Sequence, residues 1–198
     1  MSDDIDNEKR ALRAEIRERR QLLSESQRES ASVGIAAQLD ELISAHGAQS
    51  ISCYLSMMTE PGTREFLATA VARGIRVLLP ITRADGLLDW AVAGSIDDTI
   101  VGAYGLDEPT GEVLGPIAVG DVDLMIIPAA AVDEAGMRLG WGRGYFDKTL
   151  GSMERTPPVY AVIYDTEFLP GVPADLHDQP VTGVVTPTRT LTLAASAR

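Results

Sequence analysis

The sequence has few of the residues on which several common functions depend. Its 198 residues include one cysteine, Cys53, and two histidines, His46 and His177. A single cysteine excludes a disulfide within the chain and fits a reducing compartment. Two histidines are too few for a histidine-rich zinc site. Chemistry that depends on thiols or on several imidazoles is therefore not expected.

Positive charge and long apolar runs are scarce as well. The 17 Lys and Arg residues against 29 Asp and Glu residues give a net charge of −12. Such a chain is not expected to bind nucleic acid or an anionic membrane through its overall field. No apolar run is long enough to span a bilayer, and no signal-peptide pattern is visible, so we expect a cytoplasmic protein. Any anion site must be built locally from clustered cations and backbone amides.

Apolar residues make up 45% of the chain, enough for one domain over residues 1–198 with a sizeable core. Short apolar strands alternate with helices, which predicts an α/β fold with a mainly parallel central sheet flanked by helices. Residues 96–120 and the tail from 191 have no clear pattern. Strands are predicted at 50–55, 75–79 (ending before Pro80), 87–92, 122–127, 159–164 and 181–185. Helices are predicted at 8–23, 63–73 and 145–150, and from a capping box at Ser24 to Gly47.

The most informative segment runs from Arg138 to Lys148 and reads RLGWGRGYFDK. Its three glycines would let the backbone fold tightly and bring N–H groups close to a ligand. The cations suggest an anionic ligand, and Asp147 suggests an accompanying metal. The segment follows a strand and leads into a helix, a place where α/β proteins bind phosphate. It is neither a Walker A loop nor a dinucleotide fingerprint, and a glycine-rich surface turn remains open.

The loop closely resembles the signature of the 5-formyltetrahydrofolate cyclo-ligase family, typically R-L-G-x-G-x-G-Y-Y-D. The resemblance extends over most of the chain, from about Lys9 to Thr186. Two departures stand out, because Gly62 replaces a frequent acid and Phe146 a second tyrosine. Further matches follow in family order: Lys9–Arg13, Tyr54–Met57, Glu60–Thr63, Leu79-Pro80, Asp89-Trp90, Glu108-Pro109, Ile127-Pro128, Asp133, Gly136, His177-Asp178 and Val185-Thr186.

The resemblance implies a fold of the NagB/RpiA/CoA-transferase-like type. It implies an enzyme that uses ATP and Mg²⁺ to convert 5-formyltetrahydrofolate into 5,10-methenyltetrahydrofolate, releasing ADP and phosphate. We expect a monomer that acts on this small molecule, with no nucleic-acid or membrane partner. Two other functions stay open: a sugar-phosphate enzyme on the same general fold, and a non-catalytic folate or nucleotide binder.

The resemblance also implies roles for individual residues. It assigns catalysis to Arg143 and Lys9, and Mg²⁺ binding to Asp147 and Asp178. Folate contacts fall to Met57, Glu60, Trp141 and Tyr145. ATP contacts fall to Lys9, Arg13, Arg138, Leu139, Gly140, Trp141, Gly142, Arg143, Gly144, Tyr145 and Phe146.

The residues alone permit plainer interpretations of the same positions. Lys9 and Arg13, four residues apart, fit an exposed basic stripe on an Arg-rich helix. Met57 and Tyr145 fit the core, and Asp147 fits a helix cap. If Lys9 and Arg13 contact ATP instead, helix 8–23 must fold back over the glycine loop.

Overall fold

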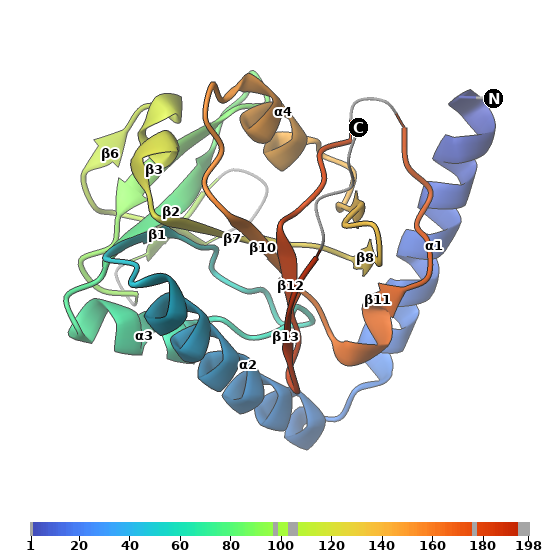
Figure 1. Ribbon diagram of the computed structural model, residues 1–198, viewed down its shortest axis with the longest axis horizontal. Coiled ribbons are helices and arrows are strands. Elements are labelled where there is room, and N and C mark those ends of the chain that lie inside the picture. Colours follow the sequence, from blue (N-terminus) through green and yellow to red (C-terminus); the bar gives the residue numbers. More distant parts are fainter. Residues whose placement is uncertain (1, 97–98, 103–106, 176–177, 194–198) are drawn as a thin grey trace.

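The protein is described here from a computed structural model, which describes residues 2–96, 99–102, 107–175 and 178–193. Within these residues an eight-stranded sheet forms the centre, in the order β13-β12-β10-β7-β1-β2-β3-β6 (Figure 1). Its strands are β1 (Ser50–Ser52), β2 (Arg76–Thr82), β3 (Leu88–Val92), β6 (Val113–Leu114), β7 (Leu124–Pro128), β10 (Val159–Val162), β12 (Gly183–Val185) and β13 (Thr190–Thr192).

The middle of the sheet is parallel, as predicted. Strands β12, β10, β7, β1 and β2 pair in parallel. Strands β13, β3 and β6 are each antiparallel to a neighbour and extend the two edges. Every residue of β10 is buried, as expected for a strand covered on both faces. The predicted mixed α/β class is confirmed.

Helices cover both faces of this sheet. Its helices are α1 (Ser2–Leu22), α2 (Glu25–His46), α3 (Arg64–Ala72) and α4 (Tyr145–Ser152). In Figure 1, α2 and α3 lie below the sheet and α4 above it. One apolar cluster includes Ile35 of α2 and Phe66 of α3, and a second includes Leu150 of α4. The two clusters form the core on the two sides of the sheet.

Local signals set the ends of α2 and the start of α3. The Gln27 N–H donates to Ser24 Oγ at 3.2 Å, and the Ser24 N–H donates to Gln27 Oε1 at 2.8 Å. This is the predicted capping box. Gly47 ends the helix with φ of 60°, a left-handed conformation that suits glycine. Thr63 precedes α3, but its hydroxyl donates to the Tyr54 carbonyl at 2.6 Å instead of capping.

Several short strands were not predicted from the sequence. The stretch 96–120 was predicted to be irregular, and 97–98 and 103–106 lie outside the described residues. Its described part contains β6, and β13 begins at Thr190 and continues into the tail. Strands of two or three residues are too short to show a period of two. The others missed are β4 (Thr99–Val101), β5 (Asp107–Pro109), β8 (Ala131–Asp133), β9 (Arg138–Leu139), β11 (Phe168–Leu169), and the 3-10 helices η2 (Pro116–Asp121) and η3 (Asp165–Glu167).

The predicted end of the second strand at Pro80 is wrong, because β2 continues to Thr82. The pairing of β1 with β2 ends at Ser52 and Leu78. Beyond that point Pro80 pairs only with β3, opposite Trp90. A proline has no N–H to donate, so it is tolerated where one side of the strand lacks a partner.

The one cysteine is buried at the end of β1. The Cys53 side chain is 1% exposed, and burial raises the pKa of its thiol to about 12. The thiolate is the reactive form, so we expect no labelling of the native protein by a thiol reagent at about pH 8. Complete labelling should follow in denaturant. Rapid labelling of the folded protein would contradict this placement.

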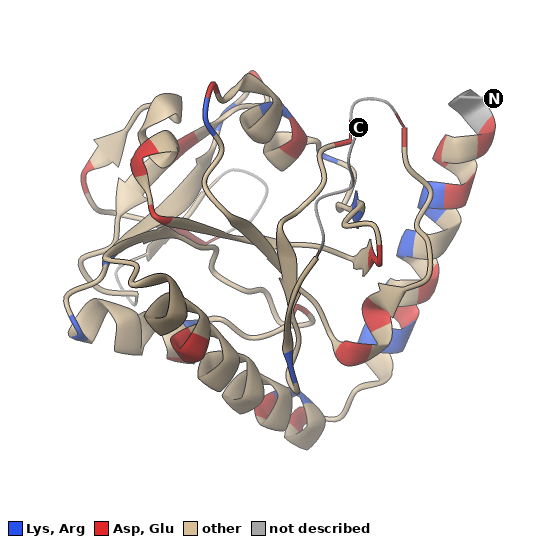
Figure 2. Cartoon of the chain, in the orientation of Figure 1, with Lys and Arg blue, Asp and Glu red and all other residues tan. Residues whose placement is uncertain are grey.

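Helix α1 lies apart from α2 and α3, beside β8 and β11 (Figure 1). Its Ile16 packs with Ala131 and Leu139 in a third apolar cluster, which Leu12 adjoins. Charged residues of both signs alternate along the rest of α1 (Figure 2). In the described part of the chain, no helix combines the length and apolar character needed to cross a membrane. Because Ile16 packs against Leu139, the first helix does fold back toward the segment that contains Leu139.

Candidate functional site

A cavity of about 380 Å³ lies where β1, β2 and β7 end. This is the edge at which α/β sheets place ligands. One wall comes from the segments that follow β1 and β2, and the opposite wall from the glycine loop and the start of α4. The lining residues are Tyr54, Leu55, Met57, Glu60, Leu79, Pro80, Thr82, Leu88, Asp107, Glu108, Pro128, Arg138, Gly140, Trp141, Arg143, Gly144, Tyr145, Phe146 and Asp147.

The glycine loop turns sharply at two of its glycines. Gly142 has φ of 92° and Gly144 has φ of 71°, and α4 begins directly after Gly144. A Cβ at position 142 would lie 3.4 Å from Cζ of Arg13. The Arg13 side chain donates to the Gly140 carbonyl at 2.7 Å. The positive φ therefore favours glycine at 142, and a Cβ there would only touch the Arg13 side chain at van der Waals distance.

Oppositely charged side chains meet near the base of the loop. Lys9 Nζ donates to Asp178 at 2.6 Å and to Asp175 at 3.1 Å. Arg138 forms an ion pair with Asp147. Asp178 also exerts an electrostatic influence on Arg138. Segments far apart in the sequence thus bring cations and carboxylates together beside the cavity.

Two of the buried cations, Lys9 and Arg138, respond differently to their surroundings. Burial lowers the pKa of Arg138, despite the opposing attraction of Asp147 and Asp178. Burial alone would also lower the pKa of Lys9, but its hydrogen bonds to Asp178 and Asp175 outweigh that effect and raise it. Both side chains remain positively charged near neutral pH. They supply the local positive charge that this acidic chain otherwise lacks.

The opposite wall carries a carboxylate in an apolar setting. The Met57 N–H donates to Glu60 Oε2 at 2.9 Å. Burial raises the pKa of Glu60, and the Met57 hydrogen bond and the charge of Arg20 oppose this rise. Burial likewise raises the pKa of the neighbouring Tyr54 well above its usual value. This wall fits a flat, partly polar ligand held by a few fixed polar groups.

Trp141 closes the cavity from the side of α1. Its ring lies 4.9 Å from Cζ of Arg20 and 5.7 Å from Cζ of Arg17. The half-buried indole also packs against the cluster that contains Ile16 and Leu139. Its Nε1 is buried with no hydrogen-bond partner among the described groups. The indole therefore touches both α1 and the ligand cavity.

The structure brings most of the predicted site residues to one place. Leu139 is an exception, because its side chain is buried against α1 and its carbonyl accepts the Ala130 N–H at 2.8 Å, so the prediction that it contacts ATP is not supported. Four other predicted residues are not among the described lining residues: Gly142, Arg13, Lys9 and Asp178. Arg13 contacts the loop at the Gly140 carbonyl, and Lys9 contacts Asp178. His177 lies outside the described residues. The predicted residues in the wall are Met57, Glu60, Arg138, Gly140, Trp141, Arg143, Gly144, Tyr145, Phe146 and Asp147.

Glu108 is a lining residue that the sequence did not single out for the site. It is buried, and its Oε1 accepts hydrogen bonds from the Thr82 N–H at 3.0 Å and the Thr82 hydroxyl at 2.6 Å. Glu108-Pro109 was among the matches to the family, but the sequence assigned Glu108 no role in the site. Leu79 and Pro80 were also missed as lining residues, although the rule that ligands bind at strand ends points to them.

Asp147 and Asp178 are the carboxylates considered for a divalent cation, and they could bind one only together with other ligands such as water or phosphate. Among the described residues, no group of three or more His, Cys, Asp and Glu side chains is placed to hold a metal. Asp147 and Asp178 both act electrostatically on Arg138. Mg²⁺ commonly uses one or two protein carboxylates and takes its other ligands from water and substrate phosphates. Two carboxylates would suffice for Mg²⁺ only together with a phosphate ligand, and in this structure Asp147 is paired with Arg138 and Asp178 with Lys9.

Comparison with known proteins decides the family. The model of the 5-formyltetrahydrofolate cyclo-ligase family matches residues 5–187. The chain belongs to the 5-formyltetrahydrofolate cyclo-ligase family. A cyclo-ligase of this name from Mycolicibacterium smegmatis is 35% identical over 91% of this chain and 94% of its own. One from Escherichia coli is 28% identical over 88% of this chain and 97% of its own.

Solved structures agree with this cyclo-ligase assignment. The NMR structure of 5,10-methenyltetrahydrofolate synthetase from Aquifex aeolicus superposes with a TM-score of 0.80. It is 26% identical, and the match covers 96% of this chain and 95% of that one. The synthetase from Mycoplasma pneumoniae has a TM-score of 0.72 at 20% identity, covering 90% and 98%, and supports the fold alone.

The structure explains one of the two departures from the cyclo-ligase signature. A Cβ at Gly62 would lie 2.0 Å from Oγ of Ser32 on α2. A side chain at position 62 would therefore require α2 to move away from this turn. Phe146 is half-buried, lines the cavity and packs against the apolar cluster under α4. Nothing in the structure requires a hydroxyl there.

Proposed function

We propose that this protein converts 5-formyltetrahydrofolate and ATP into 5,10-methenyltetrahydrofolate, ADP and phosphate. The observation that carries the proposal is the position of the family's glycine loop. It faces the folded-back helix through Arg13 and forms a wall of the cavity through Trp141 and Tyr145. One loop can thus contact a phosphate chain and a flat ring at the same time.

In the proposed reaction the formyl oxygen attacks the γ-phosphorus of ATP, and the bond from phosphorus to ADP breaks. The formyl carbon becomes electrophilic, because its oxygen is now a good leaving group. N10 of the folate attacks this carbon and loses its proton, and phosphate leaves with the former formyl oxygen. The protein's main tasks are alignment and neutralisation of charge, as in other phosphoryl transfers.

We assign these tasks to the cations and glycines around the loop. Arg143 and Lys9 neutralise charge on the transferred phosphoryl group, while Arg13 and Arg138 help to hold the triphosphate. The backbone N–H groups of the loop and the start of α4 favour phosphate oxygens. Asp147 and Asp178 would hold Mg²⁺, which supplies further positive charge to the phosphates. The ion pairs of these carboxylates would rearrange when ATP binds.

The opposite wall receives the folate. Met57 offers a polarizable thioether, and Trp141 and Tyr145 offer flat faces for the ring system. Glu60 accepts hydrogen bonds from ring N–H groups and is kept in place by the Met57 N–H. We further propose that the enzyme acts in the cytoplasm. We also propose that it is a monomer, which sedimentation of the purified protein would test.

Turnover provides the first test of the proposal. Purified protein with 5-formyltetrahydrofolate, ATP and Mg²⁺ should produce the near-ultraviolet absorption of methenyltetrahydrofolate, and omission of ATP should abolish it. Folate binding without turnover would instead support a non-catalytic binder. Neither folate binding nor turnover, together with activity on a sugar phosphate, would favour the alternative enzyme on this fold.

A double substitution of Lys9 and Arg13 tests the assignment of α1 to ATP. Replacing both with methionine should raise the KM for ATP about tenfold or more, because two cations near the phosphates are lost. The KM for folate should change far less. The matched control is Arg10→Met, since Arg10 is exposed on the same helix and bonds only Asn7 among the described contacts. A larger effect on the KM for folate than on that for ATP would mean that Lys9 and Arg13 bind folate instead.

A further inference from the structure

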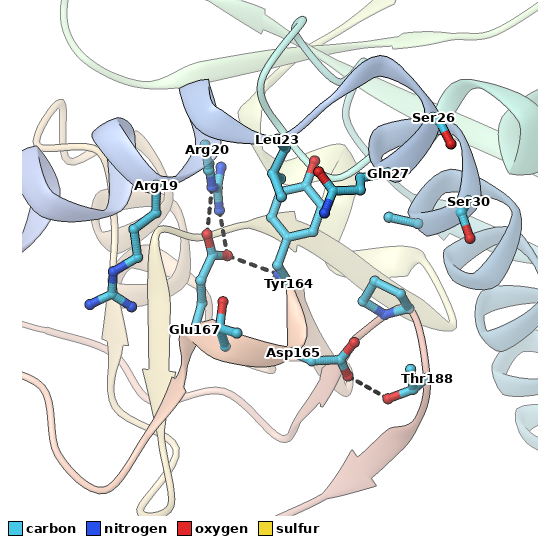
Figure 3. Close-up of a pocket in the computed structure, with 13 residues that line it drawn as sticks. Arg19, Arg20, Leu23, Ser26, Gln27, Ser30, Tyr164, Asp165, Glu167 and Thr188 are labelled. Carbon is cyan, nitrogen blue, oxygen red and sulfur yellow. Dashed lines mark hydrogen bonds and ion pairs between the residues drawn. The ribbon is translucent and has the colours of Figure 1, made fainter.

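Arg20 is a fully buried cation near the end of α1. Its side chain is 1% exposed, and that of its partner Glu167 is 3% exposed. Arg20 Nε donates to Glu167 Oε1 at 2.7 Å, and Nη2 donates to Oε2 at 2.8 Å (Figure 3). Nη2 also donates to the carbonyl of Ala129, directly after β7, at 2.9 Å. These bonds fix the plane of the guanidinium group in one orientation.

Two aromatic rings contact this fixed guanidinium. Cζ of Arg20 lies 4.9 Å from the ring centre of Trp141 and 5.4 Å from that of Tyr164. The Tyr164 N–H donates to Glu167 Oε2 at 2.8 Å, so the same carboxylate orders the tyrosine backbone (Figure 3). Of the two rings, only that of Trp141 lines the cavity assigned to folate. The buried ion pair therefore touches one wall of the active site from behind.

The backbone around Trp141 gives the indole little support of its own. Gly140 and Gly142 flank it, and Gly142 adopts a positive φ. Glycines impose few conformational limits on their neighbours. The orientation of the indole must then come from the groups packed on it. Arg20 provides the closer of the two cation contacts, since the exposed Arg17 lies 5.7 Å away.

We propose that Arg20, oriented by Glu167, is a positioning residue that holds the Trp141 indole in place as the folate-facing wall of the cavity. The inference deepens the proposed cyclo-ligase function and rests on it for the identity of the ligand. A planar guanidinium is suited to this role, because it stacks on the indole while its edge bonds the carboxylate. An ion pair that served stability alone would not need an aromatic partner, since well-packed apolar residues often replace such pairs without loss.

This role predicts a specific kinetic signature. A wall that is disordered in the free enzyme must be ordered when folate binds, so the affinity for folate falls. The phosphoryl-transfer groups on the other side of the loop remain in place. The KM for 5-formyltetrahydrofolate should therefore rise while kcat and the KM for ATP change little.

The experiment uses the double variant Arg20→Met/Glu167→Gln, which removes both charges and leaves an oxygen to accept from the Tyr164 N–H. Arg20→Lys keeps the charge without the planar fork. Arg19→Met is the matched control, because Arg19 is exposed and pairs with Glu15 on the same helix. All are made with and without Trp90→Phe, which leaves Trp141 as the sole tryptophan, since the chain has two. Steady-state kinetics and acrylamide quenching of Trp141 fluorescence are measured.

The double variant should raise the KM for 5-formyltetrahydrofolate about tenfold, with kcat and the KM for ATP within about twofold. Quenching of Trp141 should increase severalfold in the same variant, Arg20→Lys should lie in between, and Arg19→Met should match the parent. Unchanged quenching and unchanged KM in the folded double variant would overturn the inference. The inference would also be overturned if kcat and both KM values worsened equally in the variants, in proportion to their loss of thermal stability. If the parent enzyme fails to turn over, the proposed function fails, and the quenching comparison still decides the positioning role.

Discussion

Replacing Asp147 with asparagine should lower kcat for methenyltetrahydrofolate formation by about 100-fold or more, the scale at which transition-state charge stabilisation is lost in other enzymes. Asparagine keeps the size of the side chain but removes the negative charge assigned to Mg²⁺. That charge also pairs with Arg138, which is buried next to the cavity. The substitution thus removes a proposed metal ligand, and it also leaves Arg138 without the negative charge that it pairs with.

The protein should remain folded in this variant. Arg138 is buried beside Asp147, but the asparagine oxygen can still accept its hydrogen bond, so the free energy of unfolding should fall by about 1–3 kcal/mol, less than when no acceptor remains. Glu154→Gln is the matched control, since Glu154 is an exposed acid just beyond α4. Circular dichroism and thermal unfolding check the fold, and the near-ultraviolet assay checks kcat. An undiminished rate would remove Asp147 from the metal site.

The largest effect on stability is expected from Arg20→Met alone. This change leaves Glu167 buried without its cation, and breaking one side of a buried ion pair costs about 3–5 kcal/mol. Arg20→Met/Glu167→Gln should recover much of that loss, because no buried charge remains. Urea unfolding of the two variants measures the difference. Equal destabilisation by the single and double variants would show that lost packing, not the orphaned carboxylate, dominates.

The same substitution should make stability depend on pH. Burial raises the pKa of Glu167, and the ion pair with Arg20 opposes the rise. Without Arg20 the pKa should rise further, so the folded protein holds a proton that the unfolded chain releases. Such a group favours folding below its unfolded pKa and loses that contribution as pH rises toward its folded pKa. The free energy of unfolding of Arg20→Met should thus be close to that of the parent at about pH 5. The difference between the two should be largest at about pH 8.

The extent to which the fold follows from the sequence can be seen in individual elements. The parallel core strands were predictable from continuous apolar runs such as 122–127, and α2 from its capping box and terminal glycine. The β8, β9 and β11 sheet was not, because strands of two or three residues form only when distant segments meet. Thr63 illustrates the same limit, since its hydroxyl prefers the Tyr54 carbonyl over the predicted cap.

The candidate site shows a similar division. The glycine loop, Met57 and Glu60 could be named from the signature and its neighbouring motifs, and the structure gathers them around one cavity. The folded-back helix was needed to pair Lys9 with Asp178, which lie 169 residues apart. No local pattern identifies Arg20, since an arginine in an Arg-rich helix looks like a surface residue. Glu108 was matched to the family, but the sequence assigned it no role. Their burial depends on tertiary packing.

The central claim is that the formyl oxygen is phosphorylated and leaves as part of phosphate. It is tested most directly by following a heavy oxygen isotope placed in the formyl group of the substrate. After turnover with unlabelled ATP in unlabelled water, mass spectrometry of the released phosphate should find the label in one phosphate oxygen at each turnover. Unlabelled phosphate, with the heavy oxygen in water or formate, would contradict the account.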